Sequence, residues 1–212
     1  MGRHRLGTTC HPFEPDGPGA ASVRARALGF DHVDVMLGVD PATLALPIGI
    51  AIAAPIPVAG WTMCPAFAQG EGQWDACVAA FRAAPGCLLE PLAGSVVDSI
   101  ASVRAMLAAV PGLRLAVDTG HVAGWGEDPL ILLEHAAHVQ LRQGGGGQPQ
   151  LRLDDPAGAV DFAAVLGRLD AIGYDGALTI EYFDRPAFGM PFADCHDATV
   201  ELALHVRGLM GE

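Results

Sequence analysis

Short apolar runs of strand type alternate with helical patterns along most of the chain, and this alternation limits the folds that the chain can adopt. Aliphatic side chains recur on one helical stripe in Ser95–Ala109 and in Ala159–Ile172, and a last helix is expected over about Ala193–Leu209. Strands that alternate with helices are typical of a parallel α/β fold, in which the crossover helices cover the sheet. The seven predicted strands are Arg5–Thr9, His32–Leu37, Ile48–Ala54, Cys87–Leu92, Leu113–Asp118, His138–Arg142 and Ala177–Tyr182.

Four of these strands share a second pattern, which favours a closed barrel over an open sheet. One face of each strand is aliphatic, as with Leu115 and Val117, while the other carries smaller residues and ends in a polar group. In a TIM barrel the inward faces converge at the C-terminal strand ends, where several strands supply catalytic groups. No linker divides the chain, and Gly144–Gly147 is expected to be a flexible loop. We therefore predict a TIM (β/α) barrel that forms a single domain over residues 1–212.

The polar groups at the four strand ends are Glu90, Asp118, Gln140 and Glu181. Taken singly, each is compatible with a solvated residue at the end of a strand. Together, three carboxylates at one barrel mouth would repel one another unless a cation neutralised them. Oxygen ligands suit a hard or borderline divalent ion, Mg²⁺ or Mn²⁺, with Co²⁺ as a further option. The pattern therefore predicts a metal site at the mouth of the barrel.

Four motifs in this region carry a family resemblance. The chain resembles the sugar phosphate isomerase/epimerase group of xylose isomerase-like TIM barrels. The order and spacing of the motifs match from about Glu90 to Tyr182, and a weaker likeness extends back to Arg5. Many members have histidine where this chain has Gln140, whereas the hydroxypyruvate isomerase branch, which the chain resembles in His-Val-Gln, has glutamine. The motifs are Leu88-Leu89-Glu90-Pro91, Val117-Asp118-Thr119-Gly120-His121, His138-Val139-Gln140-Leu141-Arg142, and Tyr174-Asp175-Gly176 followed by Ile180-Glu181-Tyr182.

The resemblance implies a metal held by Glu90, Asp118, Gln140 and Glu181, and a reaction that moves a proton next to a carbonyl group. In such a reaction the metal polarises the carbonyl and hydroxyl oxygens of a small sugar or hydroxy-carbonyl substrate and stabilises an enediolate. Glu90 and Glu181 would then exchange the proton, which permits isomerisation or epimerisation.

Other residues are candidates for binding the substrate. His121 is expected to hydrogen-bond a substrate oxygen, or else to be a turn histidine that caps the following helix. Arg142 is expected to pair with a substrate carboxylate or phosphate, or to form a structural salt bridge. Trp61 and Trp125 follow predicted strand ends and could stack on a sugar or pack as core or lid residues. His138 is expected to be a packed residue of the inner face.

The chain also departs from the family, whose members usually have eight strands. The stretch Gly60–Gly86 offers one helix, around Trp74–Ala83, where a helix, a strand and a second helix are expected. The sequence therefore predicts a barrel of about seven strands that is shortened or open on this side. This departure supports an alternative function, that of a non-catalytic truncated barrel which binds a ligand or partner.

Charge excludes several classes of function. The net charge is −12, and all 12 cations are arginine. Nucleic acid is an unexpected partner, because its binding needs clustered cations. Without lysine, Schiff-base chemistry and a P-loop are excluded. The sequence does not determine the oligomeric state, and it is compatible with a homo-oligomer.

Two further features bear on the compartment. Pro41–Gly70 lacks charged residues, but prolines interrupt it and its apolar stretch is short of a membrane span, so we expect a buried strand followed by a loop. The five cysteines are scattered without CxxC spacing, and no apolar leader follows Met1–Arg5. These features predict reduced thiols in a cytoplasmic protein.

Overall fold

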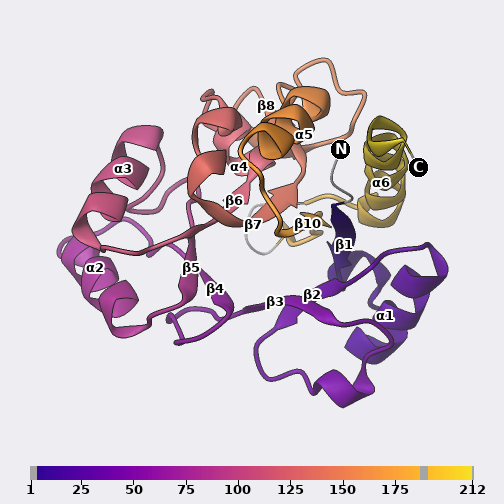
Figure 1. Ribbon diagram of the computed structural model, residues 1–212, viewed down its shortest axis with the longest axis horizontal. Helices are drawn as coiled ribbons and strands as arrows, with labels where there is room; N and C mark the ends of the chain where they lie inside the picture. The colour runs from indigo at the N-terminus through magenta and orange to yellow at the C-terminus, as the bar shows by residue number, and fades with distance from the viewer. Residues whose placement is uncertain (1–3, 187–190, 212) are drawn as a thin grey trace.

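Eight parallel strands close into a barrel in this computed structural model, which describes residues 4–186 and 191–211 (Figure 1). Around the barrel the strands follow the order β1-β10-β7-β6-β5-β4-β3-β2, and every neighbouring pair is parallel. The barrel strands are β1 (Arg5–Thr9), β2 (Val33–Met36), β3 (Ile48–Ile52), β4 (Thr62–Pro65), β5 (Cys87–Glu90), β6 (Leu115–Asp118), β7 (Ala136–Leu141) and β10 (Ala177–Ile180).

Helices lie around the outside of the barrel, with α2 and α3 beside β5 and with α6 beside β1 and β10 (Figure 1). Capping decides where α3 begins. Its first residue is Ile100 and not Ser95, because the Ser99 hydroxyl accepts a hydrogen bond from the Ser102 N–H while the Ser102 hydroxyl accepts one from the Ser99 N–H. The α-helices are α1 (Gly17–Ala27), α2 (Gln73–Ala83), α3 (Ile100–Ala109), α4 (Thr119–Gly124), α5 (Phe162–Ala171) and α6 (Cys195–Met210).

All seven strands expected from the sequence are present, so the TIM-barrel prediction is confirmed. The prediction of an open barrel with about seven strands is wrong. The eighth strand is β4, which lies inside the stretch Gly60–Gly86 and pairs with β3 on one side and β5 on the other. Its four residues, Thr62 to Pro65, are too few to show the alternation of apolar and polar side chains that identifies a strand.

The barrel is shortened in its helical layer. In the described part of the chain, β2 connects to β3 through a single 3₁₀ turn (Pro41–Thr43), and β3 connects to β4 without a helix. Figure 1 accordingly shows no α-helix over β3 and β4 between α1 and α2. The charge-free stretch Pro41–Gly70 supplies the expected strand and loop, and also β4. The strand, β3, is less buried than expected, because only Ile50 among its five residues is fully buried. No helix among the described residues is long and apolar enough to cross a membrane.

The expected division between the two faces of the strands is present. Side chains such as Val117 and Ile180 join the large core between barrel and helices, and a smaller apolar cluster of Ile50, Met63, Leu88 and Ala116 fills the barrel itself. All five cysteines are buried free thiols, as the sequence predicts.

A buried polar group lies in the barrel below the strand ends. The His32 ring is 2% exposed, and its Nε2 lies 2.9 Å from the Thr179 hydroxyl. A Cβ atom at Gly7 or Gly49 would collide with this ring, so both strands need glycine where they pass it.

The segment expected to be a flexible loop is instead part of an antiparallel hairpin, β8 (Gln143–Gly145) and β9 (Gln148–Leu151). Gly145, Gly146 and Gly147 have positive φ angles, which glycine adopts without a steric penalty at the turn. The hairpin packs on α4 so closely that a Cβ atom at Gly144 would meet the backbone of Gly120. This contact fixes the position of the hairpin beside the strand ends.

Candidate functional site

A pocket of about 160 Å³, called the mouth pocket here, opens at the C-terminal ends of the strands. One part of its wall is apolar and includes Met36, Ile52 and Leu92. The polar and aromatic part of the wall comes from β5, α4, the residue that follows β7 and the segment that follows β10. That part comprises Glu90, His121, Arg142, Glu181, Phe183 and Arg185.

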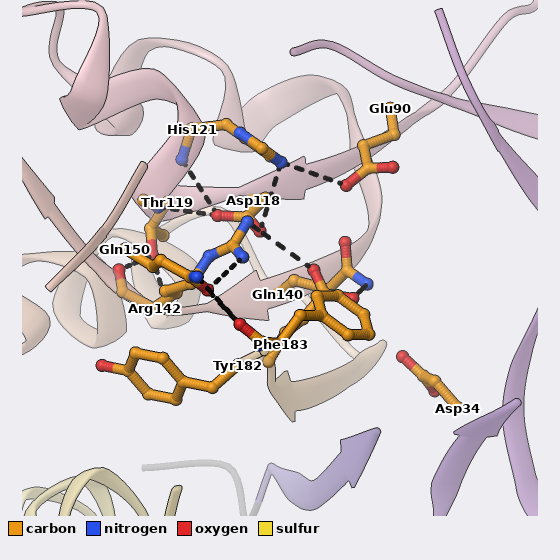
Figure 2. A network of polar contacts seen from close by, with 12 residues as sticks. Asp34, Glu90, Asp118, Thr119, His121, Gln140, Arg142, Gln150, Tyr182 and Phe183 are labelled. Atoms are coloured by element: carbon orange, nitrogen blue, oxygen red, sulfur yellow. Dashed lines mark hydrogen bonds and ion pairs between the residues drawn. The ribbon is translucent and has the colours of Figure 1, made fainter. Parts of the chain in front are cut away.

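Three buried groups form a compact donor cluster at this mouth. The backbone N–H groups of Gly120 and His121 donate to Asp118 Oδ1 at 2.8 and 3.0 Å, so that Asp118 caps α4. His121 then turns its ring toward Glu90, with Nε2 3.6 Å from Glu90 Oε1 and 4.0 Å from Asp118 Oδ2 (Figure 2). One ligand atom from each of Glu90, Asp118 and His121 lies within 4.8 Å of the others.

The other two predicted ligands form a second pair beside this cluster. Gln140 donates from Nε2 to Glu181 Oε1 at 2.8 Å, and both side chains are buried. Gln140 Oε1 and Glu181 Oε2 are also buried, and neither has a hydrogen-bond partner among the described residues. Each is therefore an acceptor available to a cation or a donor.

Arg142 connects the two groups. Its Nη2 lies against Asp118 Oδ2 and is 4.0 Å from Glu181 Oε2, while Nη1 donates to Gln150 Oε1 at 3.3 Å (Figure 2). The side chain is fully buried, with 1% exposed. Of the two roles expected for Arg142, this geometry favours the structural salt bridge.

The charges shift the acidity of the three carboxyl groups in different directions. Burial and the neighbouring Asp118 charge raise the pKa of Glu90 to about 8. Burial and the Glu90 charge raise the pKa of Glu181 well above its ordinary value. Burial opposes ionisation of Asp118 as well, but the Arg142 guanidinium outweighs it and lowers the pKa of Asp118. Asp118 is thus the stable anion, while the two glutamates hold protons more readily.

The imidazole of His121 is neutral in this environment. Burial lowers the pKa of His121 to about 4, although the Asp118 charge opposes this shift. A neutral imidazole is the form that ligates metals or donates to a substrate oxygen. From the sequence, His121 is expected to contact the substrate or to be a turn histidine, and not to ligate a metal. Its spacing of three residues from Asp118 is the signal that places its ring beside that carboxylate.

The residues present fit a divalent ion. Carboxylate oxygens, an imidazole nitrogen and an amide oxygen are ligands that borderline ions such as Mn²⁺ and Co²⁺ accept, and carboxylates also suit Mg²⁺. The unpartnered Gln140 Oε1 and Glu181 Oε2 are buried acceptors of the kind that a bound cation satisfies. Arg142 supplies one positive charge beside Asp118, and a divalent ion that bound Glu90 and Glu181 would displace the protons that these two groups hold in its absence.

The structure does not bring the two tryptophans into the mouth pocket. Trp61 immediately precedes β4 and so lies at the N-terminal end of the barrel, half-exposed, where its Nε1 donates to the Gly49 carbonyl. The expectation that it stacks on a substrate at the mouth is therefore wrong. Trp125 follows α4 and packs against the main core, in line with its expected alternative role. His138 is buried in the barrel, 2.7 Å from Asp34, as expected of a packed inner-face residue.

Three residues at the site are not among those expected from the sequence: Gln150, Phe183 and Arg185. Gln150 bonds Arg142 and also holds Phe183, whose carbonyl accepts from Nε2 at 2.9 Å (Figure 2). Arg185 places its guanidinium carbon 4.4 Å from the centre of the Phe183 ring. The only signal in the sequence is the position of Phe183 and Arg185 just after the strand end at Glu181.

Comparisons with known proteins agree with the barrel fold. The family model described as xylose isomerase-like TIM barrel matches residues 67–204. A comparison with curated proteins found no match. Among solved structures, 3-keto-D-glucoside 4-epimerase from E. coli has a TM-score of 0.73 and 14% identity, covering 97% of this chain and 100% of that one.

Two further solved structures are similar at low identity. L-ribulose 3-epimerase has a TM-score of 0.65 and 18% identity, covering 99% of this chain and 94% of that one. A xylose isomerase-like TIM barrel protein from Mycobacterium smegmatis, in complex with magnesium, has a TM-score of 0.69 and 11% identity, covering 98% of this chain and 96% of that one. At these identities the similarity shows a shared fold.

Proposed function

Because the chain belongs to the xylose isomerase-like TIM barrel family, we propose that it is a metal-dependent isomerase or epimerase that moves a proton next to the carbonyl group of a small sugar or hydroxy-carbonyl compound. The observation that carries this proposal is the pair of buried acids Glu90 and Glu181, which line one pocket. Two strands, β6 and β7, separate β5 from β10 in the barrel, so the two acids reach the pocket from different sides. Epimerisation needs such an arrangement, because the proton leaves one face of the carbon and returns to the other.

Glu90, Asp118, Gln140 and Glu181 would hold the divalent ion, Mn²⁺ or Mg²⁺ with Co²⁺ as an alternative, and His121 offers a nitrogen donor beside the first two. When bound, the ion supplies Lewis-acid polarisation of the substrate's carbonyl and hydroxyl oxygens, which acidifies the C–H bond between them. The clustered donor atoms of Glu90, Asp118 and His121 support this site, as do the unpartnered acceptors on Gln140 and Glu181.

The chain's own residues divide the proton chemistry. Glu90 and Glu181 reach the pocket from different strands, and a carboxylate oxygen of each that does not bind the ion could accept a proton and release it again. One would remove the proton to form an enediolate of the substrate, and the other would return it. Asp118 is held as an anion by Arg142, so it would act as a ligand and not as a proton carrier. If its ring does not itself ligate the ion, His121 would donate from Nε2 to a substrate oxygen.

One observation favours a second function, a non-catalytic barrel that binds a ligand or partner. The Arg142 guanidinium already pairs with Asp118, one of the proposed metal ligands, and so provides part of the charge that an ion would provide. The missing strand that supported this alternative in the sequence is, however, present as β4.

Metal content and proton exchange test the proposal together. Protein purified without chelator should contain about one equivalent of Mn²⁺, Mg²⁺ or Co²⁺. The metal-loaded protein should also incorporate deuterium from D₂O beside the carbonyl of at least one ketose in a panel of dihydroxyacetone, L-ribulose and D-fructose, followed by NMR. Absence of both metal and exchange would favour the non-catalytic barrel.

A further inference from the structure

We propose that the chain has a second ligand site, at the end of the barrel opposite the mouth pocket, which binds a flat aromatic compound that carries a carboxylate or phosphate group. The site is a cavity of about 540 Å³, called the floor cavity here, and this volume lies within the roughly 300–1,000 Å³ that is usual for small-molecule sites. It shares no lining residue with the mouth pocket. Its lining gathers at the N-terminal strand ends, where Arg5 begins β1 and where β2, β4 and β6 are immediately preceded by His32, Trp61 and Arg114.

The floor cavity exists because small residues lie at the beginnings of the strands. A TIM barrel is normally filled by layers of side chains. Here Gly49, Ala137 and Ala177 line the cavity, and their side chains are too short to fill the barrel at this level. The His32 ring, which is 2% exposed and lies between Gly7 and Gly49, also lines the cavity and limits its depth.

Two exposed guanidinium groups give the floor cavity its preference for an anion. Arg5 lies two residues before Gly7 on β1, so both residues are on the inward face of the strand. Arg114 is held along one edge, since its Nε donates to the His135 carbonyl at 3.1 Å and its Nη2 donates to the Ala136 carbonyl. Among the described residues, no carboxylate lies within ion-pair distance of either arginine. Both groups can therefore bind a carboxylate or phosphate.

The local charge differs in sign from that of the whole chain. One carboxylate, that of Asp175, lines the floor cavity beside Arg5 and Arg114. Two arginines against one aspartate make this region positive, although the net charge of the chain is −12. An anionic ligand is thus favoured here over a cationic one.

The indole of Trp61 gives the floor cavity a flat apolar surface. Its Nε1 donates to the Gly49 carbonyl at 2.6 Å, which holds the ring by its edge. Trp61 is nevertheless 52% exposed, whereas tryptophan is highly buried on average. An aromatic ring stacked on the indole would remove this apolar surface from water. Trp61 therefore favours an aromatic anion over a simple inorganic one.

A buried atom without a partner is an independent indication of a ligand. Nε2 of His32 lies 2.9 Å from the Thr179 hydroxyl, whereas Nδ1 is buried and has no hydrogen-bond partner in the part of the chain that the structure describes. Buried polar atoms are normally hydrogen-bonded. Because His32 lines the floor cavity, Nδ1 is the ring atom left to bond a polar substituent of the ligand or a water bound with it.

Binding of small probes tests the two parts of the ligand separately. Phenyl phosphate and benzoate carry a ring and an anion, benzyl alcohol carries the ring alone, and inorganic phosphate carries the anion alone. Ligand-observed NMR titrations would use the full chain without added metal. At least one of the two aromatic anions should bind about tenfold more tightly than benzyl alcohol and inorganic phosphate, since a hydrogen bond to a charged group contributes about tenfold or more. The tighter of the two identifies the anion as phosphate or carboxylate.

Variants assign the binding to the floor cavity. Arg5→Gln, at an exposed position, should weaken the tighter aromatic anion about tenfold and leave benzyl alcohol unchanged. Trp61→Leu should weaken every aromatic probe about 2- to 10-fold, the usual contribution of an aromatic contact, while Trp61→Phe should retain most of the affinity. Arg104→Gln, at an exposed arginine of α3, is the matched control and should change nothing.

Arg185→Gln distinguishes the two ends of the barrel, because Arg185 lines the mouth pocket. Binding that survives Arg185→Gln and is weakened by Arg5→Gln supports the proposal. Binding that is lost in Arg185→Gln and kept in Arg5→Gln would place the probe at the mouth and overturn it. Failure of both aromatic anions to bind at millimolar concentration, or equal affinity for phenyl phosphate and inorganic phosphate, would also overturn it. None of these measurements involves metal or turnover, so the proposed function stands or falls separately.

Discussion

Gln140 donates a hydrogen bond from Nε2 to Oε1 of Glu181 at 2.8 Å, and the same amide leaves its Oε1 buried without a partner. A buried acceptor left unsatisfied costs about 1–3 kcal/mol. The amide thus orients Glu181 with one end and presents an oxygen with the other. A cation bound at that oxygen would remove the cost, which links the orientation of Glu181 to metal binding.

Changing Gln140 to His should therefore alter which metal the protein prefers. Imidazole nitrogen suits Zn²⁺ better than amide oxygen does, so Gln140→His should shift the preference from Mg²⁺ or Mn²⁺ toward Zn²⁺. Competition between metals, followed by elemental analysis of the bound fraction, measures this shift. An unchanged metal profile would show that Gln140 is not a ligand.

Replacing either proposed proton carrier should abolish exchange beyond any effect on metal content. Glu90→Gln and Glu181→Gln keep the side-chain shape and an oxygen donor but cannot accept the proton. General acid–base catalysis contributes about 10²–10⁴-fold, so deuterium exchange in metal-loaded variants should fall by that factor. Glu71→Gln, at an exposed site, is the matched control and should keep full activity. If both variants stay active when saturated with metal, the two carboxylates only hold the ion.

Much of the fold, and the ends of four strands, follow from the sequence because strand side chains alternate with a period of two. That period places Glu90, Asp118, Gln140 and Glu181 on the inner face at the same end of the barrel. The burial of all four side chains agrees with this reasoning. Prediction from the alternation of strand side chains fails at β4, because its residues Thr62 to Pro65 are too few to display a period.

The remaining errors have local causes. Trp61 seemed to follow a strand end because β4 was not recognised, and the structure makes it the residue before that strand, at the opposite end of the barrel. Arg185 follows the strand end, where backbone contacts made by Gln150 and His11 set the path of the chain. Contacts between residues far apart in sequence have no period, and a single sequence does not reveal them. For the same reason, the sequence allows a structural salt bridge of Arg142 but does not identify Asp118 as its partner.

The buried pair of Arg142 and Asp118 should be important for stability. Arg142→Gln leaves the Asp118 carboxylate buried without its partner, which should cost about 3–5 kcal/mol in the free energy of unfolding measured with urea. Arg152→Gln breaks a half-exposed pair with Glu201 and should cost at most about 1 kcal/mol.

Metal should partly compensate for the loss of Arg142. Because the guanidinium and a divalent ion would neutralise the same carboxylates, saturating Mg²⁺ should raise the free energy of unfolding more in Arg142→Gln than in wild type. Equal stabilisation of both proteins would mean that the ion binds away from Asp118.

The last prediction concerns acid stability and the buried His32 ring. Burial lowers the pKa of His32 from 6.5 to about 4, with the positive charges of His138 and Arg5 adding to the shift and the negative charges of Asp34 and Asp31 opposing it. Between these two values the unfolded chain binds a proton that the folded chain does not, so stability is present above about pH 6.5 and is lost as the pH falls. Because a change of one in pKa corresponds to about 1.36 kcal/mol, the loss in the free energy of unfolding approaches about 3 kcal/mol near pH 4. His32→Gln should lower stability at pH 7 through lost packing, yet its free energy of unfolding in urea should fall less than that of wild type between pH 7 and pH 5. Parallel pH profiles of the two proteins would exclude His32 as the group responsible.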